Sequence, residues 1–199
     1  MSPDAQNRDR TSLCLPGKLA LVGLRGVGKT SVGWALSESL GLDFIDLDDR
    51  IAAAAGCAHS GEVIAVHGLP AFRELEREHL AATLAEPRRL VLSTGGGAIE
   101  DPSSRDLLRT AAVTIWLRAP LDVLRSRVAE DEGKRPDGGV PLRPAILSEE
   151  DTGPGAQDEF ELLGERRAPL YREVCRRAVD VGVLSPGEIA RRIARIWRG

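Results

Sequence analysis

The chain has 199 residues, a formal net charge of −3 and an isoelectric point of about 5.7, and 42% of its residues are hydrophobic. This length and composition fit one globular domain with a sizeable core, and the charge balance gives no indication of a nucleic-acid partner. The apolar runs are too short to span a membrane, and the N-terminus lacks the pattern of a secretory signal peptide. The three cysteines have neither metal-site nor disulfide-framework spacing. We therefore expect a cytoplasmic protein with no nucleic-acid or membrane partner.

Residues 1–17 are polar and are expected to form a disordered tail, so the folded domain is expected to span 18–199. Apolar runs then alternate with segments whose apolar residues recur at helical spacing. The strands expected from these runs are 18–23, 42–48, 88–94, 111–119 and 178–182. The helices expected between and after them are 29–41, 49–56, 60–68, 70–86, 101–110, 120–130, 158–177 and 185–197.

Alternating strands and helices predict an α/β fold with a mostly parallel sheet and helices on both of its faces. In such sheets ligands bind beyond the carboxyl ends of the strands. Helix ends are marked by Gly41, by Pro70, and by a capping box of Ser185 and Glu188 around Pro186. The segment 131–157 is rich in glycine, proline and charge, which is typical of disorder or of a functional lid.

The first expected strand is followed by GLRGVGKTS, the full Walker A pattern in its strand–loop–helix context. Backbone N–H groups of such a loop and the positive end of the following helix bind phosphates. Lys29 is expected to reach the β- and γ-phosphates, and the Thr30 hydroxyl to bind Mg²⁺. The pattern indicates nucleoside triphosphate binding and does not specify the acceptor. The Gly26-Val27-Gly28 spacing resembles small-molecule kinases, and the guanine motif Asn-Lys-x-Asp of GTPases does not occur in the sequence.

Three carboxylates, Asp46, Asp48 and Asp49, lie at the carboxyl end of the second expected strand. Because side chains alternate along a strand, Asp46 and Asp48 are expected to point the same way. One of them is suited to bind Mg²⁺ through water, and the other to take the proton of an attacking hydroxyl. Asp49 is interpreted as an acidic residue at a helix N-terminus.

The Walker pattern does not explain two further features of the sequence. Arg73 stands near the start of a helix, with Glu76 at a spacing that lets it orient the guanidinium. The stretch STGGGAIE (93–100) places three glycines directly after the third expected strand, although glycine is costly to order. These glycines put bare backbone at the edge of the sheet that faces the Walker loop.

Taken in order, these motifs resemble the shikimate kinase family. The Walker loop is followed by Asp-x-Asp, by Phe-Arg-x-x-Glu at 72–76, by Gly-Gly-Gly at 95–97, by an Arg-Pro lid and by RRAPLY at 166–171. The order and spacing match over roughly residues 18–197. The resemblance implies a P-loop fold of the nucleoside-monophosphate-kinase type, with a five-stranded parallel sheet, flanking helices and a lid. It also implies ATP-dependent phosphorylation of the 3-hydroxyl of shikimate, with Mg²⁺ as cofactor.

The resemblance also implies roles for individual residues. The catalytic residues are expected to be Lys29, Asp48 and Arg143, and the metal ligands Thr30 and Asp46. The residues expected to bind the nucleotide are Gly26, Val27, Gly28, Lys29, Thr30, Ser31, Arg127 and Arg143. The residues expected to bind shikimate are Asp48, Arg73, Gly95, Gly96, Gly97 and Arg167, with the two arginines on its carboxylate. This set suits a small carboxylate that carries several hydroxyls.

The sequence departs from the family pattern at three places. There are two Arg-Pro pairs in the lid, and Arg143 is favoured as the lid arginine because RPAIL resembles the family's run before the next helix, with Arg135 as the alternative. The segment VGVLSPGE (181–188) lacks the usual adenine-loop motif, so adenine is expected to be held there by backbone and apolar contacts. Ile64 stands where an aromatic residue is more usual in the wall of the acceptor pocket.

Two other functions remain in view. A kinase of another small hydroxy acid, such as gluconate, shares the Walker loop but is not expected to show the triple glycine with this set of arginines. A ligand sensor without catalysis is disfavoured because Lys29 and Asp48 are present. The expected partners are therefore ATP and shikimate, and the protein is expected to be a monomer.

Overall fold

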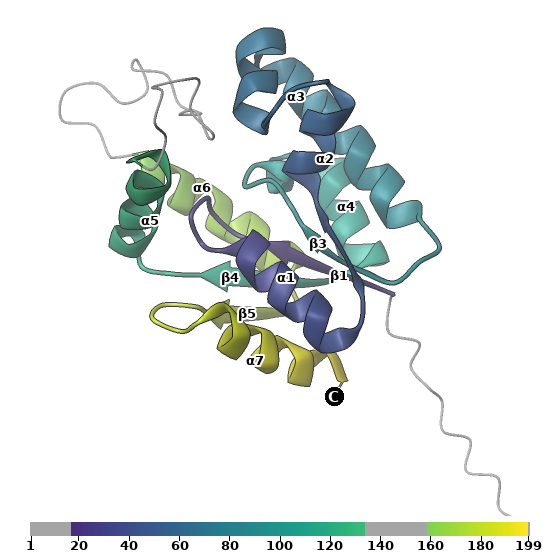
Figure 1. Ribbon diagram of the computed structural model, residues 1–199, viewed down its shortest axis with the longest axis vertical. Coiled ribbons are helices and arrows are strands. Elements are labelled where there is room, and N and C mark those ends of the chain that lie inside the picture. The colour runs from purple at the N-terminus through teal and green to yellow at the C-terminus, as the bar shows by residue number, and fades with distance from the viewer. Residues whose placement is uncertain (1–16, 134–158, 199) are drawn as a thin grey trace, which may run out of the picture.

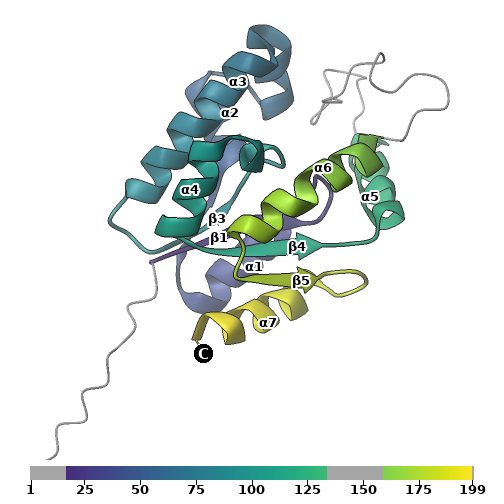
Figure 2. The same ribbon diagram turned by 180° about the vertical axis from the view of Figure 1, so that it is seen from behind.

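The computed structural model describes residues 17–133 and 159–198, which form a parallel β-sheet flanked by helices (Figures 1 and 2). The sheet has five strands in the order β2-β3-β1-β4-β5, and every neighbouring pair is parallel. The strands are β1 Lys18–Val22, β2 Asp43–Asp46, β3 Leu90–Ser93, β4 Val113–Arg118 and β5 Arg177–Asp180. The α/β class and the five parallel strands predicted from the sequence are confirmed.

Seven α-helices and one short 3₁₀ helix are described in these residues. They are α1 Lys29–Leu40, α2 Leu47–Ala54, α3 Ser60–Ala85, η1 Ala98–Glu100, α4 Pro102–Ala111, α5 Leu121–Gly133, α6 Glu159–Val174 and α7 Pro186–Arg198. Helices α1 and α7 pack on one face of the sheet, while α4 and α6 cover the other, as the two opposite views show (Figures 1 and 2).

The central strand β1 is buried on both faces of the sheet, which explains its unbroken apolar sequence. Leu19 and Leu21 pack into the hydrophobic cluster with α1 and α7, whereas Ala20 and Val22 pack into the cluster with α2, α3 and α6. All four side chains are at most 1% exposed. The carboxyl end of β1, where the Walker loop begins, is therefore held rigidly by core packing on both sides.

The second strand is shorter than predicted, and this changes the position of Asp48. β2 ends at Asp46, and α2 begins at Leu47, so Asp48 lies in the first turn of a helix. The cause is a helix cap: the Asp46 carboxylate accepts a hydrogen bond of 3.0 Å from the Asp48 N–H. The prediction that Asp46 and Asp48 share one face of a strand is wrong.

Other boundaries follow the predicted signals closely. The helices predicted at 60–68 and 70–86 form α3, which is interrupted at Gly68, where φ is 82°. Gly41 caps α1 in the left-handed conformation, and the Ser185 hydroxyl and Glu188 carboxylate form the predicted capping box. The first residues of the predicted lid, 131–133, belong to α5 instead. The rest of that segment, with Arg135 and Arg143, and residues 1–16 of the predicted tail lie outside the described residues.

Several polar residues without a predicted site role have local structural ones. The His59 imidazole caps α3 by accepting the Glu62 N–H at 3.2 Å. Cys57 and Cys175 are free thiols that pack against the core. Within residues 17–133 and 159–198, no helix is long and apolar enough to cross a membrane.

Candidate active site

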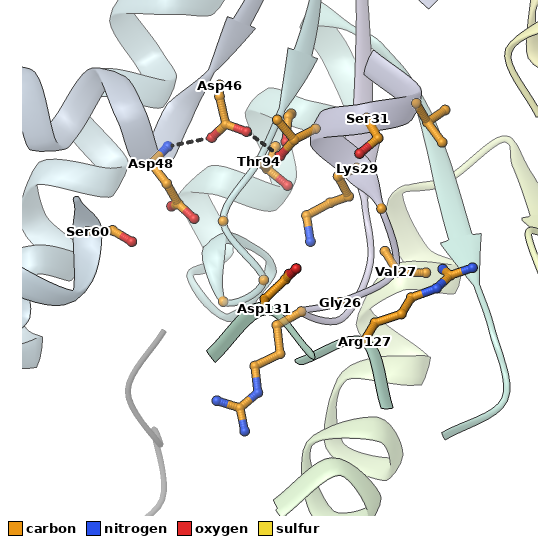
Figure 3. A pocket seen from close by; sticks show the side chains of 18 of the residues that line it. Gly26, Val27, Lys29, Ser31, Asp46, Asp48, Ser60, Thr94, Arg127 and Asp131 are labelled. Carbon is orange, nitrogen blue, oxygen red and sulfur yellow. Dashed lines mark hydrogen bonds between the residues drawn. The ribbon is translucent and has the colours of Figure 1, made fainter. Parts of the chain in front are cut away.

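A cavity of about 370 Å³ opens at the carboxyl ends of β1, β2 and β3 (Figure 3). Its walls come from the Walker loop and the start of α1, the end of β2 with the first turn of α2, the loop after β3, and helices α3, α5, α6 and α7. Every predicted site residue that the structure describes lines this one cavity, namely Gly26, Val27, Gly28, Lys29, Thr30, Ser31, Asp46, Asp48, Arg73, Gly95, Gly96, Gly97, Arg127 and Arg167. The remaining predicted residue, Arg143, lies outside the described part of the chain.

The Walker loop forms one end of the cavity. Gly26 and Gly28 have φ angles of 76° and 92°, which side chains rarely adopt. The Lys29 side chain is buried, and its ammonium donates to the carbonyls of Gly23 at 2.9 Å and Leu24 at 3.1 Å. Figure 3 shows Lys29 reaching into the cavity from the loop. The positive charge and the first N–H groups of α1 are thus directed at the same space, as an anion site requires.

The Asp46 carboxylate joins the Walker helix to the end of β2. Its Oδ2 accepts a hydrogen bond of 2.7 Å from the Thr30 hydroxyl, and its Oδ1 caps α2 through the Asp48 N–H. The cap is drawn in Figure 3, with the Asp48 carboxylate turned into the cavity. The cap therefore makes Asp46 and Asp48 neighbours. It also makes their two carboxylates point in different directions.

Two ion pairs occupy the opposite end of the cavity, between α3, η1 and α6. Arg73 donates to Glu76 at 2.6 Å, which confirms the predicted orientation of this guanidinium. Arg167 is only 1% exposed, and its Nε donates to Glu100 at 3.2 Å. Burial raises the pKa of the Glu76 carboxyl to about 7, against the lowering effect of Arg73, and the nearby Asp48 charge acts in the same direction as burial.

The three glycines after β3 pack against the pocket, and at two of them, Gly95 and Gly97, a Cβ would overlap a charged side chain. None of them has a positive φ angle. A Cβ on Gly95 would lie 2.1 Å from the Glu76 Oε1, and a Cβ on Gly97 would lie 2.1 Å from the Arg73 Nη2. Gly96 is less confined, since the nearest side-chain atom to its Cβ would be Arg167 Nη1 at 3.5 Å. The absence of side chains at the glycines therefore leaves room for the ion-paired side chains of the pocket. This is a second reason for glycine here, besides the open backbone expected from the sequence.

Two residues of the site were not identified from the sequence. The Tyr171 hydroxyl donates to the Gly96 carbonyl at 3.1 Å and so fixes the glycine turn, and burial raises the pKa of this phenol, which keeps it a donor. Its i+4 relation to Arg167 on one helix face is a signal that could have found it. Glu100 pairs with Arg167, and no sequence pattern distinguishes it from a surface carboxylate.

Comparison with known proteins agrees with this geometry. A model of the shikimate kinase family matches residues 25–197. The chain belongs to the shikimate kinase family. A shikimate kinase of Caulobacter vibrioides (strain NA1000 / CB15N) is 46% identical over 157 residues, which are 78% of this chain and 70% of the relative. A shikimate kinase of Nitratidesulfovibrio vulgaris is 37% identical over 162 residues, 81% of this chain and 85% of the relative.

A solved structure supports the same family. The shikimate kinase from Acinetobacter baumannii in complex with shikimate superposes with a TM-score of 0.76 at 28% identity, covering 92% of this chain and 93% of that one. Family membership confirms the predicted fold and the predicted enzyme class, an ATP-dependent kinase that phosphorylates shikimate. It favours shikimate over gluconate, the alternative acceptor considered from the sequence.

The packing of Gly97 against Arg73 leads to a prediction about shikimate binding. The backbone of Gly97 (φ −101°, ψ −5°) accommodates alanine, so Gly97→Ala acts by displacing the Arg73 guanidinium. We expect Gly97→Ala and Arg73→Ala each to raise the KM for shikimate by about tenfold or more, as loss of a charged hydrogen bond does. In steady-state kinetics the double variant should resemble Arg73→Ala to within about twofold. Multiplicative effects of the two substitutions would contradict this explanation of the glycine.

Proposed function

We propose that the chain transfers the γ-phosphoryl group of ATP to the 3-hydroxyl of shikimate, giving shikimate 3-phosphate and ADP. The observation that carries this proposal is that one cavity holds the Walker lysine at one end and, at the other, the buried Arg167 beside the half-buried Arg73. Asp48 reaches the cavity between these ends from the first turn of α2. Such an arrangement suits phosphoryl transfer, in which catalysis consists mainly of positioning and electrostatic stabilisation.

The Walker end of the cavity is the proposed nucleotide site. Backbone N–H groups from Gly26 to Ser31 and the positive end of α1 would bind the phosphates, with Lys29 on the β- and γ-phosphates. Arg127 on α5 donates to the Gly182 carbonyl at 3.0 Å and so ties α5 to the segment before α7. The side of the cavity next to this segment is lined by Leu184, Pro186 and Ile189. These residues provide the apolar contacts expected for adenine.

The oxygen atoms at the start of the Walker helix and at the end of β2 are suited to bind Mg²⁺. The described residues contain no cluster of three or more His, Cys, Asp or Glu side chains that could hold a metal alone. Magnesium bound with a nucleotide needs only one or two protein ligands, because phosphate and water oxygens complete its octahedron. The Thr30 hydroxyl oxygen and the Asp46 carboxylate oxygen lie 2.7 Å apart, and both are oxygen atoms that can ligate a metal ion. They would hold Mg²⁺, which would supply charge neutralisation at the phosphates.

The arginine end of the cavity is the proposed acceptor site. The Nη2 of Arg167 is buried and makes no hydrogen bond with any residue in 17–133 or 159–198. A buried cationic donor of this kind is matched to a carboxylate, which arginine binds through parallel hydrogen bonds. With the carboxylate on Arg167 and Arg73, the hydroxyls of the ring would extend toward Asp48. Asp48 would then orient the 3-hydroxyl and accept its proton.

Further parts of the proposal rest on the family resemblance. Arg143, with Arg135 as the alternative, would stabilise the charge of the migrating phosphoryl group from the predicted lid. We propose a cytoplasmic enzyme that acts as a monomer, and its two described free cysteines fit a reducing compartment.

The choice of acceptor is tested by coupled measurement of ADP release with shikimate, quinate, gluconate or no acceptor. We expect shikimate to give a kcat/KM at least about a hundredfold above the other two, because the family to which the chain belongs acts on shikimate. Nuclear magnetic resonance spectroscopy of the product should show the phosphate on the 3-hydroxyl. A rate with shikimate that equals the rate without acceptor would exclude the proposed function.

The role of Asp48 is tested by Asp48→Asn, with Asp49→Asn as the matched control. Both residues lie in the first turn of α2, so both substitutions remove the same favourable charge from the helix N-terminus. We expect Asp48→Asn to lower kcat by about a hundredfold or more, the contribution typical of a general base, while the affinity for ATP is retained. Asp49→Asn should stay within about threefold of the wild type. Similar losses in both variants would assign Asp48 to helix stability instead of catalysis.

A further inference from the structure

Glu100, the last residue of η1, lies where three arginines converge behind the acceptor end of the cavity. Its Oε1 is 3.2 Å from the Arg167 Nε and 3.2 Å from the Arg166 Nε, and its Oε2 is 3.9 Å from the Arg73 Nη2. The Glu100 side chain is 19% exposed, so these charges are only partly screened by water. One carboxylate therefore connects both arginines that the proposed function places on the substrate.

The backbone of Glu100 is held in place from both sides. Its N–H donates to the Gly97 carbonyl at 2.9 Å, which makes it the closing residue of the turn that the triple glycine begins. Arg105 on α4 donates to the carbonyls of Ile99 at 3.1 Å and Glu100 at 3.0 Å. The Glu100 carboxylate is consequently presented to α6 from a fixed point.

The contact with Arg167 determines the direction of its guanidinium. The group is planar, and its N–H donors point in fixed directions, so a partner on Nε sets the direction of Nη1 and Nη2. Glu100 takes the Nε edge, and the Nη2 remains buried without a partner among the described residues. Because Glu100 does not bind at Nη2, it supports the position that receives a carboxylate and does not compete for it.

Arg73 is held from two directions as well. Glu76 accepts from its Nη1, and Glu100 faces its Nη2 at the longer distance of 3.9 Å. The Glu76 carboxyl is almost fully buried and has a raised pKa, whereas the Glu100 carboxyl is the more exposed of the two glutamates that face Arg73. A charge at Glu100 is therefore the less costly of the two counter-charges to maintain.

We propose that Glu100 is a positioning residue for recognition of the acceptor's carboxylate, acting through Arg167 and, more weakly, through Arg73. It does not touch the substrate. This inference rests on the proposed function, because it takes the substrate carboxylate to lie on these two arginines. Its consequence is that loss of Glu100 should weaken recognition of the carboxylate specifically and leave the nucleotide side unchanged.

The test compares Glu100→Ala, Glu100→Gln and the control Asp106→Asn in steady-state kinetics with shikimate and with its carboxamide analogue. Asp106 is an exposed carboxylate on α4 that pairs with Arg109 at 2.9 Å, away from the cavity. We expect Glu100→Ala to raise the KM for shikimate by about tenfold or more, with kcat and the KM for ATP within about twofold. The preference for shikimate over the carboxamide should fall by a similar factor, which links Glu100 to the carboxylate itself.

The Gln variant keeps the test valid if Glu100→Ala does not fold. Glutamine retains an oxygen that can accept from the Arg167 Nε but lacks the charge, so we expect a KM for shikimate about threefold above the wild type. Asp106→Asn should leave all values unchanged.

Two results would overturn the inference while the proposed function stands. One is a KM for shikimate in Glu100→Ala that is unchanged or lower than in the wild type. The other is a parallel rise for shikimate, carboxamide and ATP, which would indicate a general structural role. Failure of the proposed function is recognised separately, because the wild type would then show no shikimate-dependent turnover and no preference for the carboxylate.

Discussion

The acceptor end of the site depends on the burial of one guanidinium, that of Arg167, at the carboxyl edge of the sheet. An arginine that is 1% exposed must be paired, because an uncompensated buried charge destabilises a protein strongly. Glu100 provides that pairing at Nε, and the Nη2 of this cavity-lining residue has no hydrogen-bond partner among the described residues. The charge is thus retained in a place where water competes poorly, and there it attracts an incoming carboxylate more strongly than it would at the surface.

The neighbouring sequence is constrained by the same packing. Arg73 and Glu76 lie against the turn after β3, and a Cβ at Gly97 or Gly95 would overlap them. Tyr171, one turn along α6 from Arg167, holds the same turn through the Gly96 carbonyl. The glycine run therefore follows from the charged groups that surround it, and its backbone remains open to the cavity.

The two ends of the site are related by the parallel sheet. β1, β2 and β3 are adjacent and end at the same edge, so the Walker loop, the Asp46 cap and the glycine turn open into one cavity. The packing of β1 on both faces fixes the strand end from which the Walker loop begins. Reaction between two bound molecules depends on binding groups that are held in place in this way.

The sequence predicted the features that local patterns encode. The Walker loop needs particular residues at particular spacings, and the apolar strand runs reveal burial on both faces, so Lys29, Thr30 and the parallel sheet were all predictable. The start of α2 was missed because the capping role of Asp46 competes with the strand pattern of 42–48, and propensity alone does not decide between them. Glu100 was missed because its role exists only through contacts with α3 and α6, which are distant in the sequence. The position of the glycines after the third strand was predicted correctly. Their packing against Glu76 and Arg73 was not, because it depends on tertiary contacts that the local sequence does not encode.

The central claim is that the arginine end of the cavity binds the carboxylate of the acceptor and so turns its hydroxyls toward Asp48 and the Walker loop. A crystal structure of the protein with shikimate bound tests this most directly. We predict the carboxylate oxygens within hydrogen-bonding distance of the Arg167 Nη2, and the ring hydroxyls on the side of Asp48. A carboxylate that lies against Lys29 and the Walker loop, with hydroxyls toward Arg167, would contradict the account.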